Sequence, residues 1–329
     1  MNIQKKVCNL FLWLFVSATF FACESSQYDS RMVRLFRKGN NSLKKQQYKQ
    51  AAYYFSEGIK LDSSFSEIYN NLGIAMYHLG EYEKAVVQYN KALQLDSVLM
   101  DAYFNRSNAY FALEKYQTAL GDLDIVAAKY GDTSKVFFQR ASVHLQLKNY
   151  QDAIQDLNQV VRLEPKNANA LGSRGYLSYK IEKYEAARKD LETATKLNPR
   201  QDLAFANLGL VKAAQGDTTQ ALADFGKALA INAVEGYTLS HRAMIYAANG
   251  QMKKSWRDIQ DALKYDADAG WPYLARGYYY LKEGKYEYAL EDFKKAKKLD
   301  KQIDEADKYI FSVSKRLQPM PEMIQRSQN

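Results

Sequence analysis

The chain contains only two cysteines, Cys8 and Cys23, and both lie near its amino-terminal end. The rest of the 329 residues can therefore form no disulfide, no CxxC redox pair and no thiolate metal site. An oxidising compartment would not harm this chain, and its stability must come from packing.

Residues and motifs that carry catalysis are also scarce. The chain has three histidines, and they fall far apart in the sequence. The motifs HExxH, GxSxG, GxxxxGK[ST] and GxGxxG are absent. The sequence therefore predicts no enzyme, no metal site and no cofactor. The formal charge of +9 is spread over 46 basic and 37 acidic residues, a balance that gives little support to nucleic-acid binding.

Small residues recur at a fixed interval of 34 residues, without insertion or deletion. They are Ala51, Ala85, Ala119, Ala153, Ala187, Ala221, Ser255 and Ala289. Counted as 34 positions from Met32, each repeat has this residue at position 20, another small residue at position 8 and a large apolar residue at position 24. Such a period indicates one supersecondary unit stacked on itself, and a stacked array works through the surface that it presents.

The second repeat shows the full pattern. Its pattern residues are Tyr69, Leu72, Gly73, Tyr77, Gly80, Tyr82, Ala85, Tyr89, Ala92 and Leu95. This pattern resembles the tetratricopeptide repeat family, whose repeat is a helix, a tight turn and a second helix, here called A and B. The resemblance implies an all-α, right-handed α-solenoid of eight helix-turn-helix repeats. The predicted repeats cover residues 32–65, 66–99, 100–133, 134–167, 168–201, 202–235, 236–269 and 270–303.

One more helix is predicted after the last repeat, over residues 304–317. Its apolar side and its charged side alternate at helical spacing, as a capping helix at the end of a stacked array requires. Residues 318–329 contain Pro319 and Pro321 and little to bury, so we expect a mobile tail.

The amino-terminal segment differs from the repeats. Lys5 and Lys6 precede an apolar run that ends at Ala22-Cys23 and is followed by polar residues. This arrangement resembles a bacterial lipoprotein signal peptide over residues 1–22. The resemblance implies lipidation of Cys23, for example with palmitate, and a short tether over residues 23–31. It also implies a lipid anchor in the bacterial cell envelope, with the outer membrane favoured over the inner. The alternative is an uncleaved signal anchor with an incidental cysteine.

A basic cluster follows the proposed anchor and contains no acidic residue. Its members are Arg31, Arg34, Arg37, Lys38, Lys44, Lys45 and Lys49. Lys and Arg near anionic lipid each add on the order of 1 kcal/mol to membrane binding. The cluster is either a membrane-surface patch or an ordinary solvated face.

Arginine at position 7 and aspartate at position 23 occur together in five repeats. The pairs are Arg106/Asp122, Arg140/Asp156, Arg174/Asp190, Arg242/Asp258 and Arg276/Asp292. We interpret them as structural ion pairs between the A and B helices that fix register rather than add much stability. The sixth repeat has Asp224 without its arginine, because Leu208 occupies position 7.

In the family, partners bind the concave face lined by the A helices. On that basis we predict a groove whose members are Phe104, Asn108, Phe138, Tyr176, Tyr179, Trp271 and Tyr278. Some of these must belong to the core, since neighbouring A helices also pack together. No lysine occupies position 5 in any repeat, so the carboxylate clamp of chaperone-binding relatives is absent.

The sequence therefore favours a membrane-anchored scaffold or adaptor that binds an amphipathic segment of another protein, in assembly of an envelope complex. The alternative is a cell-surface lipoprotein that stacks aromatic rings on carbohydrate, although the array lacks the long insertions usual in nutrient-binding relatives. An enzyme is the third class and is the least supported.

Overall fold

The computed structural model describes residues 29–129 and 133–317. This described part contains seventeen helices, α2 to α18, and no strand. The predicted signal peptide, the lipidated Cys23 and the tail over 318–329 lie outside the described residues. The tether over 23–31 is described only from Asp29 onward.

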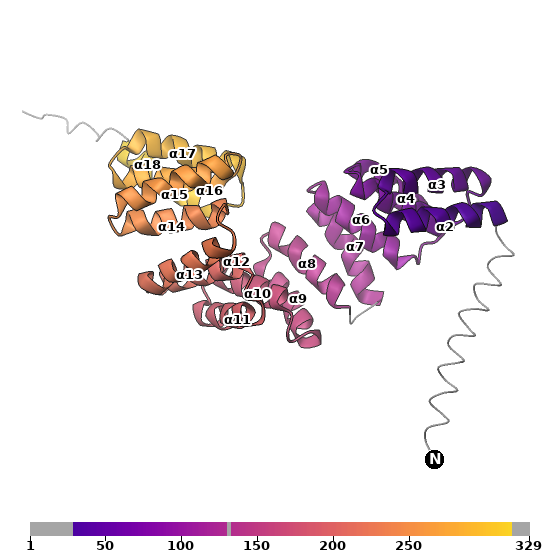
Figure 1. Cartoon of the computed structure of the whole chain (residues 1–329), viewed down its shortest axis with the longest axis horizontal. Helices are drawn as coiled ribbons and strands as arrows, with labels where there is room; N and C mark the ends of the chain where they lie inside the picture. Colours follow the sequence, from indigo (N-terminus) through magenta and orange to yellow (C-terminus); the bar gives the residue numbers. More distant parts are fainter. Residues whose placement is uncertain (1–28, 130–132, 318–329) are drawn as a thin grey trace, which may run out of the picture. The chain divides into compact units, whose positions relative to one another are not determined.

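The chain divides into two compact units, residues 1–147 and 148–329 (Figure 1). The first unit contains α2 (Ser30–Lys44), α3 (Tyr48–Leu61), α4 (Ser66–His78), α5 (Tyr82–Leu95), α6 (Met100–Ala112), α7 (Tyr116–Lys129) and α8 (Ser134–Gln146). The second contains α9 (Tyr150–Leu163), α10 (Ala168–Lys180), α11 (Tyr184–Leu197), α12 (Asp202–Ala214), α13 (Thr218–Ile231), α14 (Gly236–Ala248), α15 (Met252–Tyr265), α16 (Gly270–Lys282), α17 (Tyr286–Leu299) and α18 (Asp304–Leu317).

The helices follow the 34-residue period closely. From the second repeat onward every A helix covers positions 1–13, and every B helix covers positions 17–30. Helix α18 follows the last B helix and packs on it through the buried residues Ala306 and Val313. The prediction of an all-α solenoid built from helix-turn-helix repeats is confirmed.

The turn between the A and B helices has the same backbone conformation in all eight repeats. Position 15 has a positive φ throughout, which stops helix A and lets the chain reverse. Four repeats place glycine there, as in Gly80 with φ 78°. The other four place a larger residue there, and one of these is Lys148 with φ 60°. The same turn therefore fixes where the side chain of Lys148 begins.

The A and B helices of a repeat approach closely because positions 8, 20 and 24 fit together. All eight residues of the position 20 column are fully buried. A Cβ added to Gly73 would lie 2.5 Å from the ring of Tyr89, and one added to Gly277 would lie 2.7 Å from the ring of Phe293. The Cβ added to Gly277 would also lie 3.2 Å from the backbone oxygen of Ala289, the residue at position 20 of that repeat.

The sizes of the residues at positions 8 and 24 compensate for each other. An aromatic residue at position 24 always faces glycine at position 8 of the same repeat. Where position 8 carries a Cβ, as in Ser107 and Ala243, position 24 is the aliphatic Leu123 or Ile259. The volume between the helices is therefore kept nearly constant, as a close-packed interior requires.

Four of the five arginine–aspartate pairs form bidentate contacts between the helices of one repeat. The N–O distances are 2.8 and 2.7 Å for Arg106–Asp122, 2.6 and 2.8 Å for Arg174–Asp190, 2.7 and 2.8 Å for Arg242–Asp258, and 2.7 and 2.7 Å for Arg276–Asp292. Each aspartate is buried. Arg140 belongs to the first unit and Asp156 to the second, so that pair stays a prediction.

Three of these arginines also reach back to the preceding repeat. The Nη1 atom of Arg106 donates to Asn90 at 2.6 Å, and that of Arg174 donates to Asn158 at 2.9 Å. Arg140 makes the same contact with Asp124 at 2.9 Å. The acceptor occupies position 25 of the previous B helix each time, so the guanidinium groups of Arg106 and Arg174 each connect three helices.

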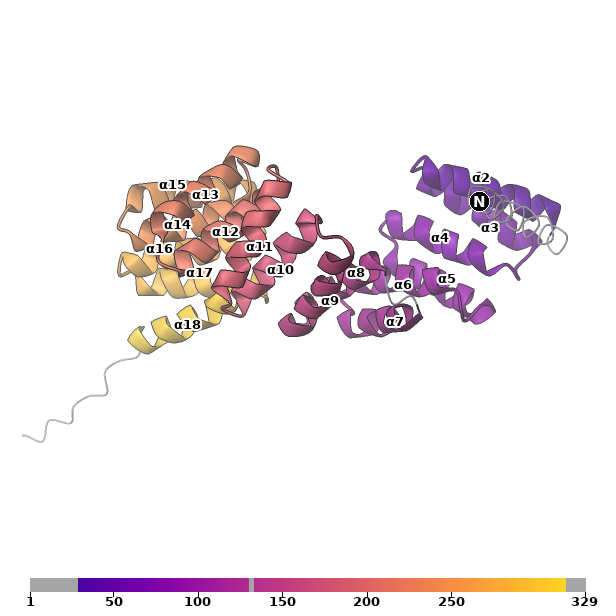
Figure 2. The same ribbon diagram turned by 90° about the horizontal axis from the view of Figure 1, so that it is seen from below.

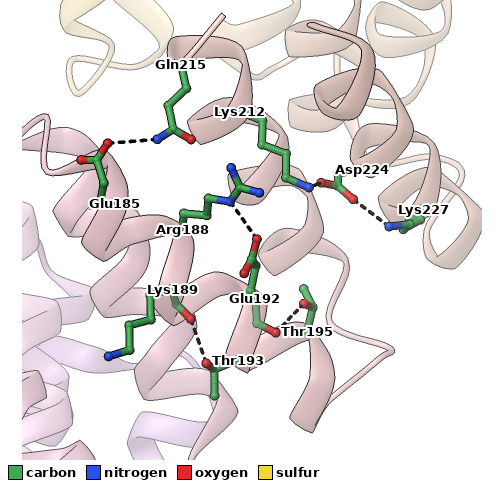
Figure 3. A network of polar contacts seen from close by, with 10 residues as sticks. All are labelled: Glu185, Arg188, Lys189, Glu192, Thr193, Thr195, Lys212, Gln215, Asp224 and Lys227. Atoms are coloured by element: carbon green, nitrogen blue, oxygen red, sulfur yellow. Dashed lines mark hydrogen bonds and ion pairs between the residues drawn. The ribbon is translucent and has the colours of Figure 1, made fainter. Parts of the chain in front are cut away.

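In the sixth repeat, lysine takes the role of the missing arginine. Lys212 lies in α12, one turn after Leu208, and its Nζ donates to Asp224 at 2.5 Å (Figure 3). Lys227 binds the other carboxylate oxygen at 2.9 Å. Because Asp224 is 1% exposed, it needs such compensation, and two lysines supply it.

We predict that Gly73→Ala lowers the free energy of unfolding by about 1–3 kcal/mol, because the new Cβ meets the ring of Tyr89. In a Tyr89→Leu background the same substitution should be neutral or stabilising, since leucine leaves room for the Cβ and alanine favours a helix over glycine by about 1 kcal/mol. Urea unfolding of the four proteins in this double-mutant cycle measures both effects. An equal cost in the two backgrounds would contradict the close-approach argument.

We predict that Arg106→Leu destabilises the protein by about 3–5 kcal/mol, because it leaves the buried carboxylate of Asp122 unpaired. The double variant Arg106→Leu/Asp122→Leu should be more stable than the single one, since it removes the uncompensated charge. Urea unfolding midpoints of the two variants check this order. The reverse order would show that the pair itself supplies the stability.

Candidate partner-binding faces

A chain of asparagine side chains crosses the first three A helices of the first unit. Asn71 Nδ2 donates to Asn40 Oδ1 at 2.8 Å, and Asn70 Nδ2 donates to Asn71 Oδ1 at 3.0 Å. Asn105 Nδ2 then donates to Asn70 Oδ1 at 3.0 Å. This amide chain joins α2, α4 and α6 and was missed by the groove prediction. Its signal in the sequence was asparagine at positions 5, 6 and 9 of consecutive repeats.

The amide chain has hydrogen-bonding capacity to spare. A carboxamide has two N–H donors and an oxygen with two lone pairs, whereas each bond in the chain uses one donor and one lone pair. A peptide group presents the same kind of donor and acceptor. Asn70 is buried, whereas Asn40, Asn71 and Asn105 are partly exposed. These three amides can therefore exchange hydrogen bonds with the backbone of an extended or helical segment without reading its side chains.

The predicted groove residues of the first unit lie at the far end of this row. Asn108 lies one turn after Asn105 on α6, so the two side chains share a face of that helix. Phe104 and Phe138 are half-buried, and the Nζ of Lys135 lies 4.4 Å from the centre of the Phe104 ring. The two rings contribute both to the core and to the surface that they border.

The predicted groove residues of the second unit belong to an aromatic cluster on its A helices. Tyr237 lies edge-on to Trp271 with ring centres 5.2 Å apart, and His241 contacts the same indole at 4.5 Å. Tyr176 and Tyr179 add half-buried rings from α10. We call this set, together with Tyr278 of α16, the aromatic face.

Helix α18 lies against this aromatic face. Figure 2 shows the ribbon of α18 next to that of α17. Glu305 Oε1 lies 3.6 Å from the Nζ of Lys180, and Asp304 accepts a hydrogen bond from Lys148. One turn later, the ring of Tyr309 packs on Phe293 of α17 at 4.9 Å and on Tyr278 at 5.5 Å.

The groove of the second unit therefore stays a prediction, and the structure adds contacts of α18 beside it. Helix α18 was predicted as a cap on the last repeat only, and the structure also places its first turns near the end of α10. The pattern of a single repeat does not encode these contacts, because groups 125 to 156 residues apart are placed by how much each repeat rotates relative to the next.

Burial of the aromatic face changes the pKa values of its titratable groups. Burial, with a smaller contribution from the carboxylate of Glu305, raises the pKa of Tyr179 to about 12. The pKa of Tyr176 and that of Tyr237 are raised by the same causes. Burial, and then the charge of Lys180, lowers the pKa of His241 to about 3. Near neutral pH the tyrosines are thus protonated and the histidine is neutral.

The basic cluster is exposed on α2, the following turn and the start of α3. All seven members are exposed, and Arg31 is paired with Asp29 at 2.9 Å. Lys38 lies 5.7 Å from the ring of Tyr54. The geometry presents the cluster to solvent, and its role at a membrane surface stays a prediction.

The described part of the chain contains neither a candidate metal site nor a candidate membrane-spanning helix. Across residues 29–129 and 133–317, no three His, Cys, Asp or Glu side chains are placed to hold a metal ion. Among the helices in these same ranges, none combines the length and the apolar character that crossing a membrane requires.

Family models for tetratricopeptide repeats match several parts of the sequence. A TPR repeat model matches residues 75–114, and two tetratricopeptide repeat models match residues 104–168 and 173–234 and residues 272–303. Together these matches span more than half of the chain. No curated protein matches the sequence.

Solved structures agree on the fold. A tetratricopeptide repeat protein from Parabacteroides merdae ATCC 43184 is 18% identical with a TM-score of 0.68, covering 77% of this chain and 99% of that one. Pseudomonas aeruginosa pilF is 19% identical with a TM-score of 0.55, covering 63% and 94%. YrrB, described as a TPR protein with an unusual peptide-binding site, is 23% identical with a TM-score of 0.50, covering 57% and 97%.

Proposed function

Because this chain belongs to the tetratricopeptide repeat family, we propose that it is a scaffold or adaptor that holds a segment of another protein against its A helices. The amide chain of the first unit is the observation that carries this proposal. Asn70, Asn71 and Asn105 place carboxamides from neighbouring repeats in one hydrogen-bonded row. Such a row follows a peptide backbone from one repeat to the next.

Apolar anchors beside the row give the partner a sequence preference. Phe104 and Phe138 keep part of their rings exposed at its end. A segment with large apolar side chains at regular spacing would bind the amides through its backbone and the rings through its side chains. The peptide-binding site named for YrrB is consistent with this use of the fold.

Catalysis is not part of the proposal. The tetratricopeptide repeat fold is typically a non-catalytic interaction scaffold. The buried carboxylates that recur along the array face cations of their own, as Asp122 faces Arg106 and Asp224 faces Lys212. Carbohydrate stacking is also less favoured, because Tyr237 and Trp271 pack on each other.

We place the scaffold at a bacterial envelope membrane, held by lipid on Cys23 and most consistent with the outer membrane. The basic cluster supports this placement, since it begins eight residues after the proposed anchor and is exposed. A single acyl chain gives only marginal membrane binding, and a basic surface supplies a second attraction. A scaffold held this way would concentrate its partner at the membrane, as the assembly of an envelope complex requires.

We predict that a photo-crosslinking residue in place of Asn108 captures a partner protein in intact cells, whereas one in place of Thr118 does not. Thr118 serves as the control because it is exposed on α7, a B helix. Adding Asn71→Ala should reduce the yield about fivefold, since a lost hydrogen bond is worth about 1 kcal/mol. Equal capture at positions 108 and 118 would contradict binding at the amide chain.

We predict that Cys23→Ser moves the protein from the membrane fraction to the soluble fraction and abolishes incorporation of a labelled palmitate analogue. Cys8→Ser is the matched control and should change neither result, because residue 8 lies within the proposed signal peptide. Cell fractionation with metabolic labelling measures both. A Cys23→Ser protein that stays in the membrane without label would support an uncleaved signal anchor instead.

A further inference from the structure

Helix α18 carries two sets of contacts that serve different purposes. Ile303, Ala306 and Val313 are buried in the cluster built on α17, which is the contact that a capping helix needs. Asp304 and Glu305 instead reach lysines of the fourth and fifth repeats. Capping the last repeat does not require this second set.

The second set has the chemistry of ligand recognition. The first turn of α18 is acidic, and it meets two cations contributed by different helices: Lys148 before α9 and Lys180 at the end of α10. Tyr309, one turn after Glu305, enters between the rings of Phe293 and Tyr278. Asp304 and Glu305 therefore contact Lys148 and Lys180, and Tyr309 contacts Tyr278 of the aromatic face.

This fit leaves polar atoms without partners. Oε2 of Glu305 and Nε2 of His241 are both buried, and neither has a hydrogen-bond partner in the described part of the chain. The ion pair of Lys148 with Asp304 is partly exposed, at 38% and 40%, and such pairs hold weakly. A segment that supplied a hydrogen-bond partner for His241 Nε2 would compete with the first turn of α18.

We propose that the aromatic face binds a partner helix that begins with two adjacent carboxylates and carries an aromatic ring one turn later, and that α18 occupies this site in the free chain. This inference rests on the proposed function and names the class of partner for the second unit. Binding requires release of the first two turns of α18, which breaks the contacts of Ala306 and Tyr309 with α17 and leaves Val313 of the third turn packed there.

The test uses the full-length chain and a fluorescent peptide with the sequence of residues 303–317. In the wild type, the tethered α18 competes with the peptide at a high effective concentration. Asp304→Lys/Glu305→Lys should repel the first turn of α18 from Lys148 and Lys180. We expect this variant to bind the peptide at least tenfold more tightly than the wild type, measured by fluorescence anisotropy.

Two further variants test whether charge recognition determines peptide binding. Adding Lys148→Glu/Lys180→Glu to the first variant reverses the site and restores its attraction for α18, so peptide binding should fall to the wild-type level or below. Lys315→Glu is the matched control, because Lys315 is exposed in the last turn of α18, outside the two turns that must be released. It should bind the peptide as the wild type does.

Hydrogen exchange provides a second measurement that does not depend on the peptide. Amides in the first two turns of α18 should exchange at least tenfold faster in Asp304→Lys/Glu305→Lys than in Lys315→Glu, while α16 and α17 keep their protection. Equal peptide affinity for the wild type and Asp304→Lys/Glu305→Lys would overturn the proposal. A concentration-dependent dimer of that variant without peptide would also overturn it, by assigning the site to a second copy of the chain.

The result of the peptide-binding test can be distinguished from the result of the crosslinking test of the proposed function. Peptide binding is measured on purified protein at the second unit, whereas cellular capture is measured at position 108 of the first. Capture at position 108 with no peptide binding would remove this inference alone. Peptide binding with no captured protein would remove the cellular role and leave the site.

Discussion

The close approach of helix A and helix B within each repeat is the constraint on which the rest of the structure depends. It is set where a small residue at position 8 meets the large residue at position 24 and the backbone at position 20. Gly73 against Tyr89 and Gly277 against Phe293 leave no room for a methyl group. Because this contact recurs in every repeat at the same three positions, the A helices follow one another at regular intervals. Side chains 31 to 35 residues apart, such as Asn40 and Asn71 or Asn70 and Asn105, can then meet.

The sequence was informative wherever the structure depends on one repeat alone. The period and the small columns predict the hairpins and the all-α solenoid, since these features follow from residues within 34 positions of each other. The bidentate partner of Arg106 could be predicted in the same way, because Asp122 belongs to the same hairpin. Contacts between repeats were harder. The amide chain uses different positions on successive helices, and Lys212 replaces an arginine from a position one turn away.

The least predictable feature is the contact of α18 with the fourth and fifth repeats. Its apolar side was predictable, because Ala306 and Val313 pack on the neighbouring α17. The positions of Lys148 and Lys180 relative to Asp304 and Glu305 depend on rotations summed over several repeats. As a result, the two units present different A-helix faces. The face of the first unit carries the amide chain with Phe104 and Phe138 at its end, whereas that of the second is aromatic and is contacted by Tyr309 of α18.

The guanidinium links to the preceding repeat have a consequence for cooperativity. Arg106, Arg140 and Arg174 each tie a repeat to its predecessor through position 25. Position 25 before Arg242 is Gly226, which has no side chain to accept such a bond. In a stacked array the coupling between neighbours decides whether repeats melt together or one by one. Leu208 replaces the arginine at the junction between the fifth and sixth repeats. The junctions on both sides of the sixth repeat therefore lack this guanidinium link, and the hairpins next to them can open with less resistance from their neighbours.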